Sequence, residues 1–188
     1  MNNSCSKKFL GGKAAQSIMY GLQVALIALA VAGIASAQDY GDKLKFKGGI
    51  GVIPVTGVAA NGTVNLNVVR GVPPGAPWRI AELEAEISSD GHIKVTGRGL
   101  LLASGNGIGT NAGQSVHATL FCGAAATATA HNSTLTGVAL EADGDFRIDD
   151  FLSPAPPTPC DTPVLLIRNV GGVWFAAGIP RLPGEDRK

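Results

Sequence analysis

Residues 78–111 read WRIAELEAEISSDGHIKVTGRGLLLASGNGIGTN, and this stretch decides the fold class. Its first part alternates with period two, which predicts a strand that buries one face, because successive side chains of a strand point to opposite sides. Residues 88–91 (SSDG) predict a tight turn, since Asp bonds its own backbone and Gly accepts a positive φ. A second strand is expected to return and enter a glycine-rich loop over 104–111. The expected buried face contains Ala81, Leu83, Ala85 and Ile87, and the solvent face contains Glu82, Glu84 and Glu86.

The rest of the chain after residue 38 contains similar short apolar segments separated by turn residues. We interpret residues 38–49 as a flexible lead-in or a short edge strand. No segment of 10–15 residues has the period of a helix, so the sequence predicts a single all-β domain, either a β-sandwich or a Greek-key or jelly-roll-like barrel. Further strands are expected at 50–56, 63–69, 114–122, 133–141, 145–148, 163–170 and 173–180, with Val64, Leu66 and Val68 inward and with His117, Thr119 and Phe121 opposite the buried face of their strand.

The N-terminus has the organisation of an export signal. A segment with three lysines precedes the apolar run 18–34, and the run ends in Ala-Ser-Ala at 35–37. Such a pattern predicts a signal helix over residues 1–37, cleaved between Ala37 and Gln38, and an all-β domain over 38–188. The alternative is an uncleaved anchor, because the uncharged stretch is long enough to span a bilayer. We favour cleavage, which predicts a secreted or periplasmic protein.

The charge of the domain excludes two classes of partner. Loss of the signal removes three lysines and no acidic residue, so the formal net charge of +1 falls by three to −2. A slightly acidic domain with scattered Lys and Arg lacks the basic footprint of a nucleic-acid-binding protein. It also lacks a polybasic patch for anionic lipid. We therefore expect no nucleic acid, and membrane contact only through the signal segment if it stays uncleaved.

Cysteine usage agrees with export. Cys5 lies in the signal, which leaves Cys122 and Cys160 as an even pair in an oxidising compartment. We predict that they form a disulfide, which the chain-entropy model makes worth roughly 4 kcal/mol. The alternative is two separate buried thiols.

Metal binding has weak support in the sequence. His92, His117, His131 and Cys122 are the candidate ligands, but none of the histidines forms a close ligand pair. We interpret all three as surface histidines and expect no metal and no cofactor. The acidic stretch 143–150 offers oxygen ligands for calcium, yet a hairpin turn explains its Asp and Gly residues better.

Catalytic patterns are equally weak. The loop 104–111 contains Gly-x-Gly but lacks the following helix and the Lys-Ser/Thr ending of a phosphate-binding loop. No nucleophile elbow is present. The three glutamates of residues 82–86 have a spacing near that of an inverting glycosidase pair, but any exposed strand has it, so we interpret them as solvated charge. No catalytic residue is assigned.

Long loops of β domains often carry function, so the candidate ligand-binding residues lie there. They are Asn106 and Asn111 in the glycine-rich loop, and Trp78 as an aromatic anchor beside the proline-rich connection 72–77. For Trp78, packing in the core is the alternative, and it is the one we favour.

Four segments resemble parts of small exported bacterial β-rich proteins without assigned activity. They are GRGLLLA (97–103), LFCG (120–123), PVLLIRN (163–169) and WFAAGIP (174–180). The resemblance implies a secreted or periplasmic β protein and carries over no site.

The sequence as a whole favours an exported binding or structural module with an envelope or extracellular partner. Two alternatives come from other classes: an exported hydrolase-type enzyme and a metal-binding protein, each with a site assembled by the fold. The hydrolase requires a histidine beside a buried carboxylate in a pocket. The metal-binding protein requires three or more ligands that meet at one point.

Overall fold

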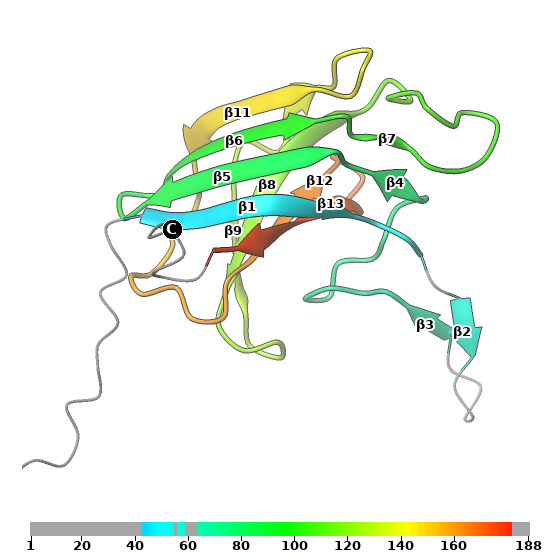
Figure 1. Ribbon diagram of the computed structural model, residues 1–188. Helices are drawn as coiled ribbons and strands as arrows, with labels where there is room; N and C mark the ends of the chain where they lie inside the picture. Colours follow the sequence, from blue (N-terminus) through cyan, green and yellow to red (C-terminus); the bar gives the residue numbers. More distant parts are fainter. Residues whose placement is uncertain (1–42, 55, 59–63, 182–188) are drawn as a thin grey trace, which may run out of the picture. The chain divides into compact units, whose positions relative to one another are not determined.

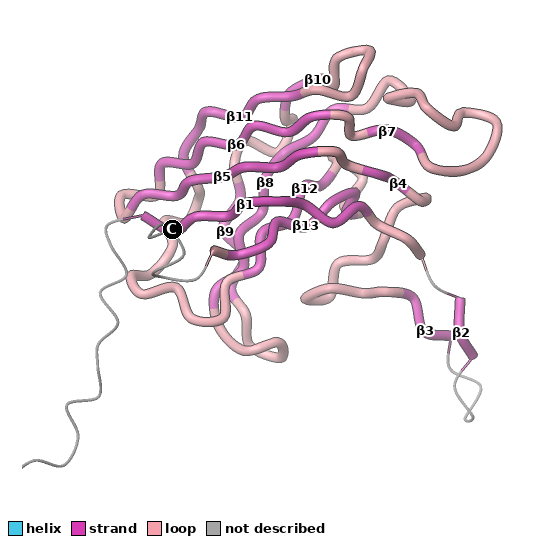
Figure 2. Tube along the Cα trace, in the orientation of Figure 1, coloured by secondary structure: helices cyan, strands magenta, loops and turns pink. Residues whose placement is uncertain are grey.

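The computed structural model describes residues 43–54, 56–58 and 64–181 (Figure 1). These residues form strands and no helix (Figure 2), so the all-β prediction is confirmed, and none of them provides a helix long and apolar enough to cross a membrane. The expected signal helix and the cleavage site at Ala37 and Gln38 lie outside the described residues. The strands are β1 (Lys43–Gly51), β2 (Thr56–Val58), β3 (Val64–Leu66), β4 (Trp78–Arg79), β5 (Glu82–Ser88), β6 (His92–Arg98), β7 (Leu101–Leu102), β8 (Ser115–Cys122), β9 (Thr129–Asn132), β10 (Val138–Ala139), β11 (Phe146–Phe151), β12 (Val164–Arg168) and β13 (Trp174–Pro180).

Most of these strands belong to one antiparallel sheet that curls into a nearly closed barrel. The strand order is β10-β8-β12-β13-β1-β5-β6-β11, and β9 pairs with β8 (Figure 1). The two ends of the sheet meet where Asn132 and Ser153 exchange backbone hydrogen bonds of 3.0 and 2.8 Å. A further backbone bond of 2.9 Å joins Glu141 to Asp145 between β10 and β11. Of the two predicted architectures, the sheet therefore adopts the barrel, which leaves few open edges.

The hairpin β5–β6 has the predicted geometry. Leu83, Ala85 and Ile87 are buried, while the three glutamates between and before them are exposed. The turn closes with a hydrogen bond of 2.9 Å from Gly91 N to Ser88 O, and Gly91 has a φ of 86°. Only the start differs: Ala81 is exposed and precedes the strand.

The prediction for the first described strand is wrong. Residues 43–51 are neither a lead-in nor an edge, because β1 lies inside the sheet between β13 and β5. Leu44 and Phe46 point into the barrel, and the alternating lysines of this strand point outward. A bulge after Phe46, with Gly48 at a φ of 90°, shifts the register and turns Ile50 outward.

The barrel is filled by side chains from every long strand. The Phe46 and Leu165 side chains both lie over Gly178, where an added Cβ would meet them at 3.1 and 3.2 Å, which identifies the inner face of β1, β12 and β13. Near one end, Trp78 stacks on Phe175 with ring centroids 4.2 Å apart. The fully buried large side chains are Phe46, Leu83, Ile93, Leu100, Leu120, Leu165, Leu166, Ile167, Val52, Val95, Val116 and Thr119.

Strand β8 is buried on both faces, which corrects the expectation that His117, Thr119 and Phe121 face solvent. The turn after β9 lies against it: Ala118 N donates to Ser133 Oγ at 3.0 Å. Gly137 approaches the backbone of Val116 so closely that a Cβ there would clash. These residues thus border the edge of β8 beyond β9, and Arg168 of β12 lies beside His117 and Thr119 on the outer face. The prediction that Val68 faces inward is also wrong, because its side chain is 53% exposed.

Gly97 permits the close packing of β6 and β11. Phe146 lies directly opposite it, and a Cβ at this position would overlap the Phe146 ring. We expect Gly97→Ala to lower the free energy of unfolding by about 2 kcal/mol, as in other overpacked cores. Urea unfolding measures this loss. Gly107→Ala is the matched control, because its Cβ meets only the side-chain ends of Leu102 and Thr110. Equal stability of both variants and the parent would show that the Phe146 ring moves aside freely.

Candidate functional site

A hollow with mainly apolar walls lies at the end of the barrel covered by residues 153–162, which we call the proline loop. Its first residue joins β9 through the Asn132–Ser153 bonds, and Gly123 N donates to Asp161 O at 2.7 Å near its end. Leu152, just before the loop, donates its N–H to Gly91 O at 2.9 Å. Both ends of the loop are therefore fixed to the sheet. Between them the loop carries four prolines at positions 154, 156, 157 and 159.

The predicted disulfide is present and anchors this loop. The Cys122 and Cys160 sulfurs are 2.01 Å apart, and their Cα atoms are 5.0 Å apart. Both cysteines are buried, Cys122 at the end of β8 and Cys160 in the proline loop. A hydrogen bond of 2.6 Å from Thr162 Oγ1 to Gly123 O reinforces the same junction.

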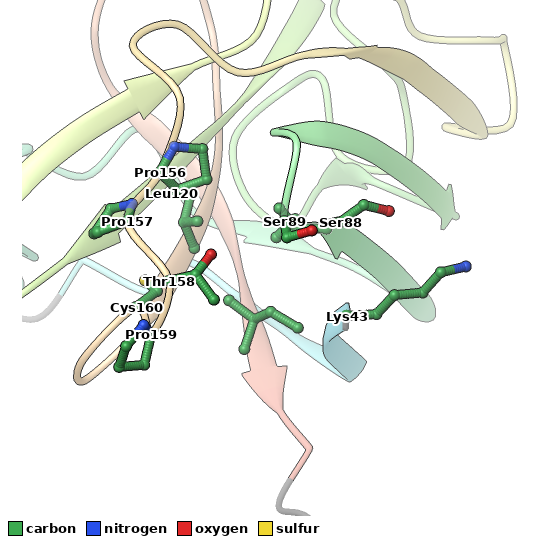
Figure 3. A pocket seen from close by; sticks show the side chains of 11 residues that line it. Lys43, Ser88, Ser89, Leu120, Pro156, Pro157, Thr158, Pro159 and Cys160 are labelled. Atoms are coloured by element: carbon green, nitrogen blue, oxygen red, sulfur yellow. The ribbon is translucent and has the colours of Figure 1, made fainter. Parts of the chain in front are cut away.

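Between the proline loop and the barrel lies a pocket of about 70 Å³ (Figure 3). Three core side chains reach it from the barrel: Leu44, Ile87 and Leu120. Lys43 lies at its rim, where its side chain extends away from the prolines (Figure 3) and its Nζ is 3.2 Å from Glu86 Oε2. The walls are apolar and the polar groups lie at the mouth. The other lining residues are Ser88, Ser89, Pro156, Pro157, Thr158, Pro159 and Cys160.

His131 is buried beside this pocket. It lies directly opposite Leu120 in the β8–β9 pair, so both side chains share the inner face of the barrel. Its exposed fraction is 3%, and its Nδ1 is 2.7 Å from the carbonyl oxygen of Pro154 in the proline loop. Its Nε2 is buried without a hydrogen-bond partner among the described residues. The structure therefore corrects the interpretation of His131 as a surface residue.

His117 is also buried, but on the outer side of β8. Its exposed fraction is 3%, and neither ring nitrogen has a partner among the described residues. Arg168 is its cross-strand neighbour, and the guanidinium donates to Thr119 Oγ1 at 3.3 Å and to Gly172 O at 3.0 Å. Burial, with a smaller effect of the Arg168 charge, lowers the pKa of His117 to about 4. His117 is therefore uncharged at neutral pH.

The third histidine lies near the surface. His92 Nε2 is 2.6 Å from Asp149 Oδ1, and Phe151 lies against the ring. The hydrogen bond from His92, aided by the positive charge of Lys94, holds the pKa of Asp149 below its usual value. The three histidines thus occupy three different places. No group of three or more His, Cys, Asp or Glu in the described part of the chain is placed to hold a metal ion.

The carboxylates considered for catalysis or calcium take part in local structure. Glu86 pairs with two lysines of β1, at 3.2 Å from Lys43 and 3.9 Å from Lys45. Glu82 is 3.1 Å from Arg98. In the β10–β11 turn, Asp143 accepts the backbone N–H of Asp145 at 3.1 Å. These contacts agree with solvated charge and a hairpin turn.

The candidate ligand-binding residues are not brought together. Trp78 is 3% exposed and stacks in the core. The side-chain amide of Asn111 donates to Leu140 O at 3.0 Å and to Glu141 O at 2.9 Å, which fixes the base of the glycine-rich loop. Asn106 is exposed near the tip of that loop, close to Ile108. The pocket was not predicted from the sequence, which named His131 only as a candidate metal ligand and favoured a surface position for it.

Comparisons with protein-family models, with curated proteins and with solved structures give no match. The site must therefore be interpreted from its own geometry.

Proposed function

We propose that this protein is an exported binding module that takes a small apolar group in the pocket beneath the proline loop. The signal-like N-terminus and the disulfide favour an oxidising, extracytoplasmic compartment. The slightly acidic charge and the solvated carboxylates favour binding over nucleic-acid recognition or hydrolysis. The partner belongs to the envelope or the extracellular space.

The observation that carries this proposal is an apolar pocket with rigid walls. One wall consists of core side chains, and the other consists of prolines held by the disulfide at Cys160. A rigid pocket loses little conformational entropy when it binds a ligand. An apolar hollow gains from an occupant because its walls lack contacts on one side.

The volume limits the ligand. At about 70 Å³ the pocket is far smaller than the sites of drug-sized molecules. It suits a group of a few heavy atoms, such as a short aliphatic molecule, the end of an acyl chain or one aliphatic side chain of a protein partner.

Xenon tests the pocket directly, because it enters apolar cavities without polar contacts. Under xenon pressure we expect the methyl NMR signals of Leu44, Ile87 and Leu120 to shift with saturation. Ile87→Phe, which fills the pocket, is expected to abolish the shifts. Ile108→Phe is the matched control, since Ile108 is 66% exposed in the glycine-rich loop. Methyl signals that do not respond to xenon in the parent protein would contradict the proposal and favour a structural role.

A further inference from the structure

The tautomer of His131 follows from its one hydrogen bond. A carbonyl oxygen only accepts, so Nδ1 carries the proton that is donated to Pro154 O across 2.7 Å. In the neutral ring, Nε2 is then a bare acceptor, and it is buried with no donor among the described residues. Native proteins rarely leave a buried acceptor unpaired, because its lost hydration is not replaced. A donor from outside the described chain would remove this cost.

The pocket beneath the proline loop is a hollow from which such a donor can come. Leu120 lines the pocket and lies directly opposite His131, and opposed side chains on one face are about 5 Å apart at Cβ. Pro154, which orients the imidazole, is two residues from Pro156 in the pocket wall. His131 does not itself line the pocket, but it is held between Leu120, a lining residue on the same face, and Pro154 of the proline loop.

We propose that the pocket and His131 form one binding site for a small uncharged molecule with a short apolar body and a single hydroxyl or N–H donor. The apolar body occupies the hollow beneath the prolines, the Leu120 side chain turns aside, and the donor binds His131 Nε2. This inference rests on the function proposed above and specifies the chemistry of the ligand that the pocket selects. A charged ligand is disfavoured, because the only cation at the rim, Lys43, is paired with Glu86 and the interior is apolar.

Two isomers of one formula, 1-butanol and diethyl ether, separate the polar contact from apolar burial. Both fill a similar volume, but only the alcohol donates a hydrogen bond. In NMR titrations of the intact protein we expect 1-butanol to bind about fivefold more tightly, the factor that one added hydrogen bond gives. The ¹⁵N signal of His131 Nε2 is expected to move with the alcohol and not with the ether, a readout that needs no substitution.

Substitutions at His131 and Leu120 show which residues produce the preference for 1-butanol over diethyl ether. His131→Phe is expected to remove the fivefold preference while ether binding remains. Leu120→Ala, which opens the hollow toward His131, is expected to raise the affinity for 1-butanol, and the double variant to lose that gain. Equal binding of both isomers, or an Nε2 signal that does not shift with the alcohol, overturns the inference. The proposed function, binding of an apolar group in the pocket, would still stand. Absence of binding by both isomers and by xenon overturns the proposed function itself.

Discussion

Replacing both Cys122 and Cys160 by alanine is expected to lower the free energy of unfolding by about 4 kcal/mol. The bond joins positions 38 residues apart, so its loss returns a large closure entropy to the unfolded chain. Alanine at both positions leaves no buried thiol, which keeps the comparison to the cross-link itself. Equilibrium unfolding in urea at neutral pH measures the loss, and the slope with denaturant shows whether the unfolded state has also expanded.

The parent protein under reducing conditions is the matched control for this variant. It is expected to lose a similar amount of stability, because the same loop is opened without a change in sequence. A loss below about 1 kcal/mol in both cases would contradict the expected role of the disulfide. It would mean that the hydrogen bonds from Gly123 to Asp161 and from Thr162 to Gly123 close the loop without help.

The hairpin β5–β6 and the disulfide could be predicted from the sequence because their signals are local or compositional. Alternation of Leu83, Ala85 and Ile87 with three glutamates fixes which face is buried, whatever covers it. The cysteine pairing follows from an even count in a domain that the sequence predicts to be exported, and it needs no geometry. Both predictions are confirmed.

The errors arise where distant parts of the chain meet. Residues 43–47 alternate as clearly as β5 does, but their position between β5 and β13 depends on a strand more than a hundred residues later. Strand β8 carries the polar residues His117 and Thr119 on its second face, and this pattern predicts that the second face contacts solvent. Arg168, from a strand some fifty residues later, lies on that face beside both residues, and no periodicity within β8 reveals it.

The candidate site could not be predicted for the same reason. Its walls come from β1, the β5–β6 hairpin, β8 and the proline loop, and each contributes residues that are ordinary in their own segment. His131 becomes distinctive only through its burial and its bond to Pro154 O. Asn111 shows the reverse: a polar loop residue suggests a ligand, yet its amide holds two carbonyl groups of its own chain.

Acidification is expected to destabilise the protein through His117. Its pKa is about 4 when folded and near 6.5 when unfolded, so the unfolded state binds more protons between these values. The contribution of His117 to the free energy of unfolding is therefore fully present above pH 6.5. It decreases as the pH falls from 6.5 to 4 and does not change further below pH 4. The expected loss between pH 7.5 and 4.5 is about 2.5 kcal/mol. The backbone N–H of Thr134 holds the pKa of Asp150 below 3.8, which places the contribution of that carboxylate at more acidic pH.

Urea unfolding of the parent protein and of His117→Leu at pH 7.5 and 4.5 tests this directly. Leucine cannot take up a proton, so the variant is expected to lose most of the difference between the two pH values, whatever the substitution does to its stability at pH 7.5. His92→Gln is the matched control: its ring is partly exposed and bonded to Asp149, and the acid sensitivity of the parent should persist there. The same pH dependence in His117→Leu as in the parent would show that the imidazole gains a partner or water when it is protonated. In that case the surroundings of His117 open to water more readily than its exposed fraction of 3% implies.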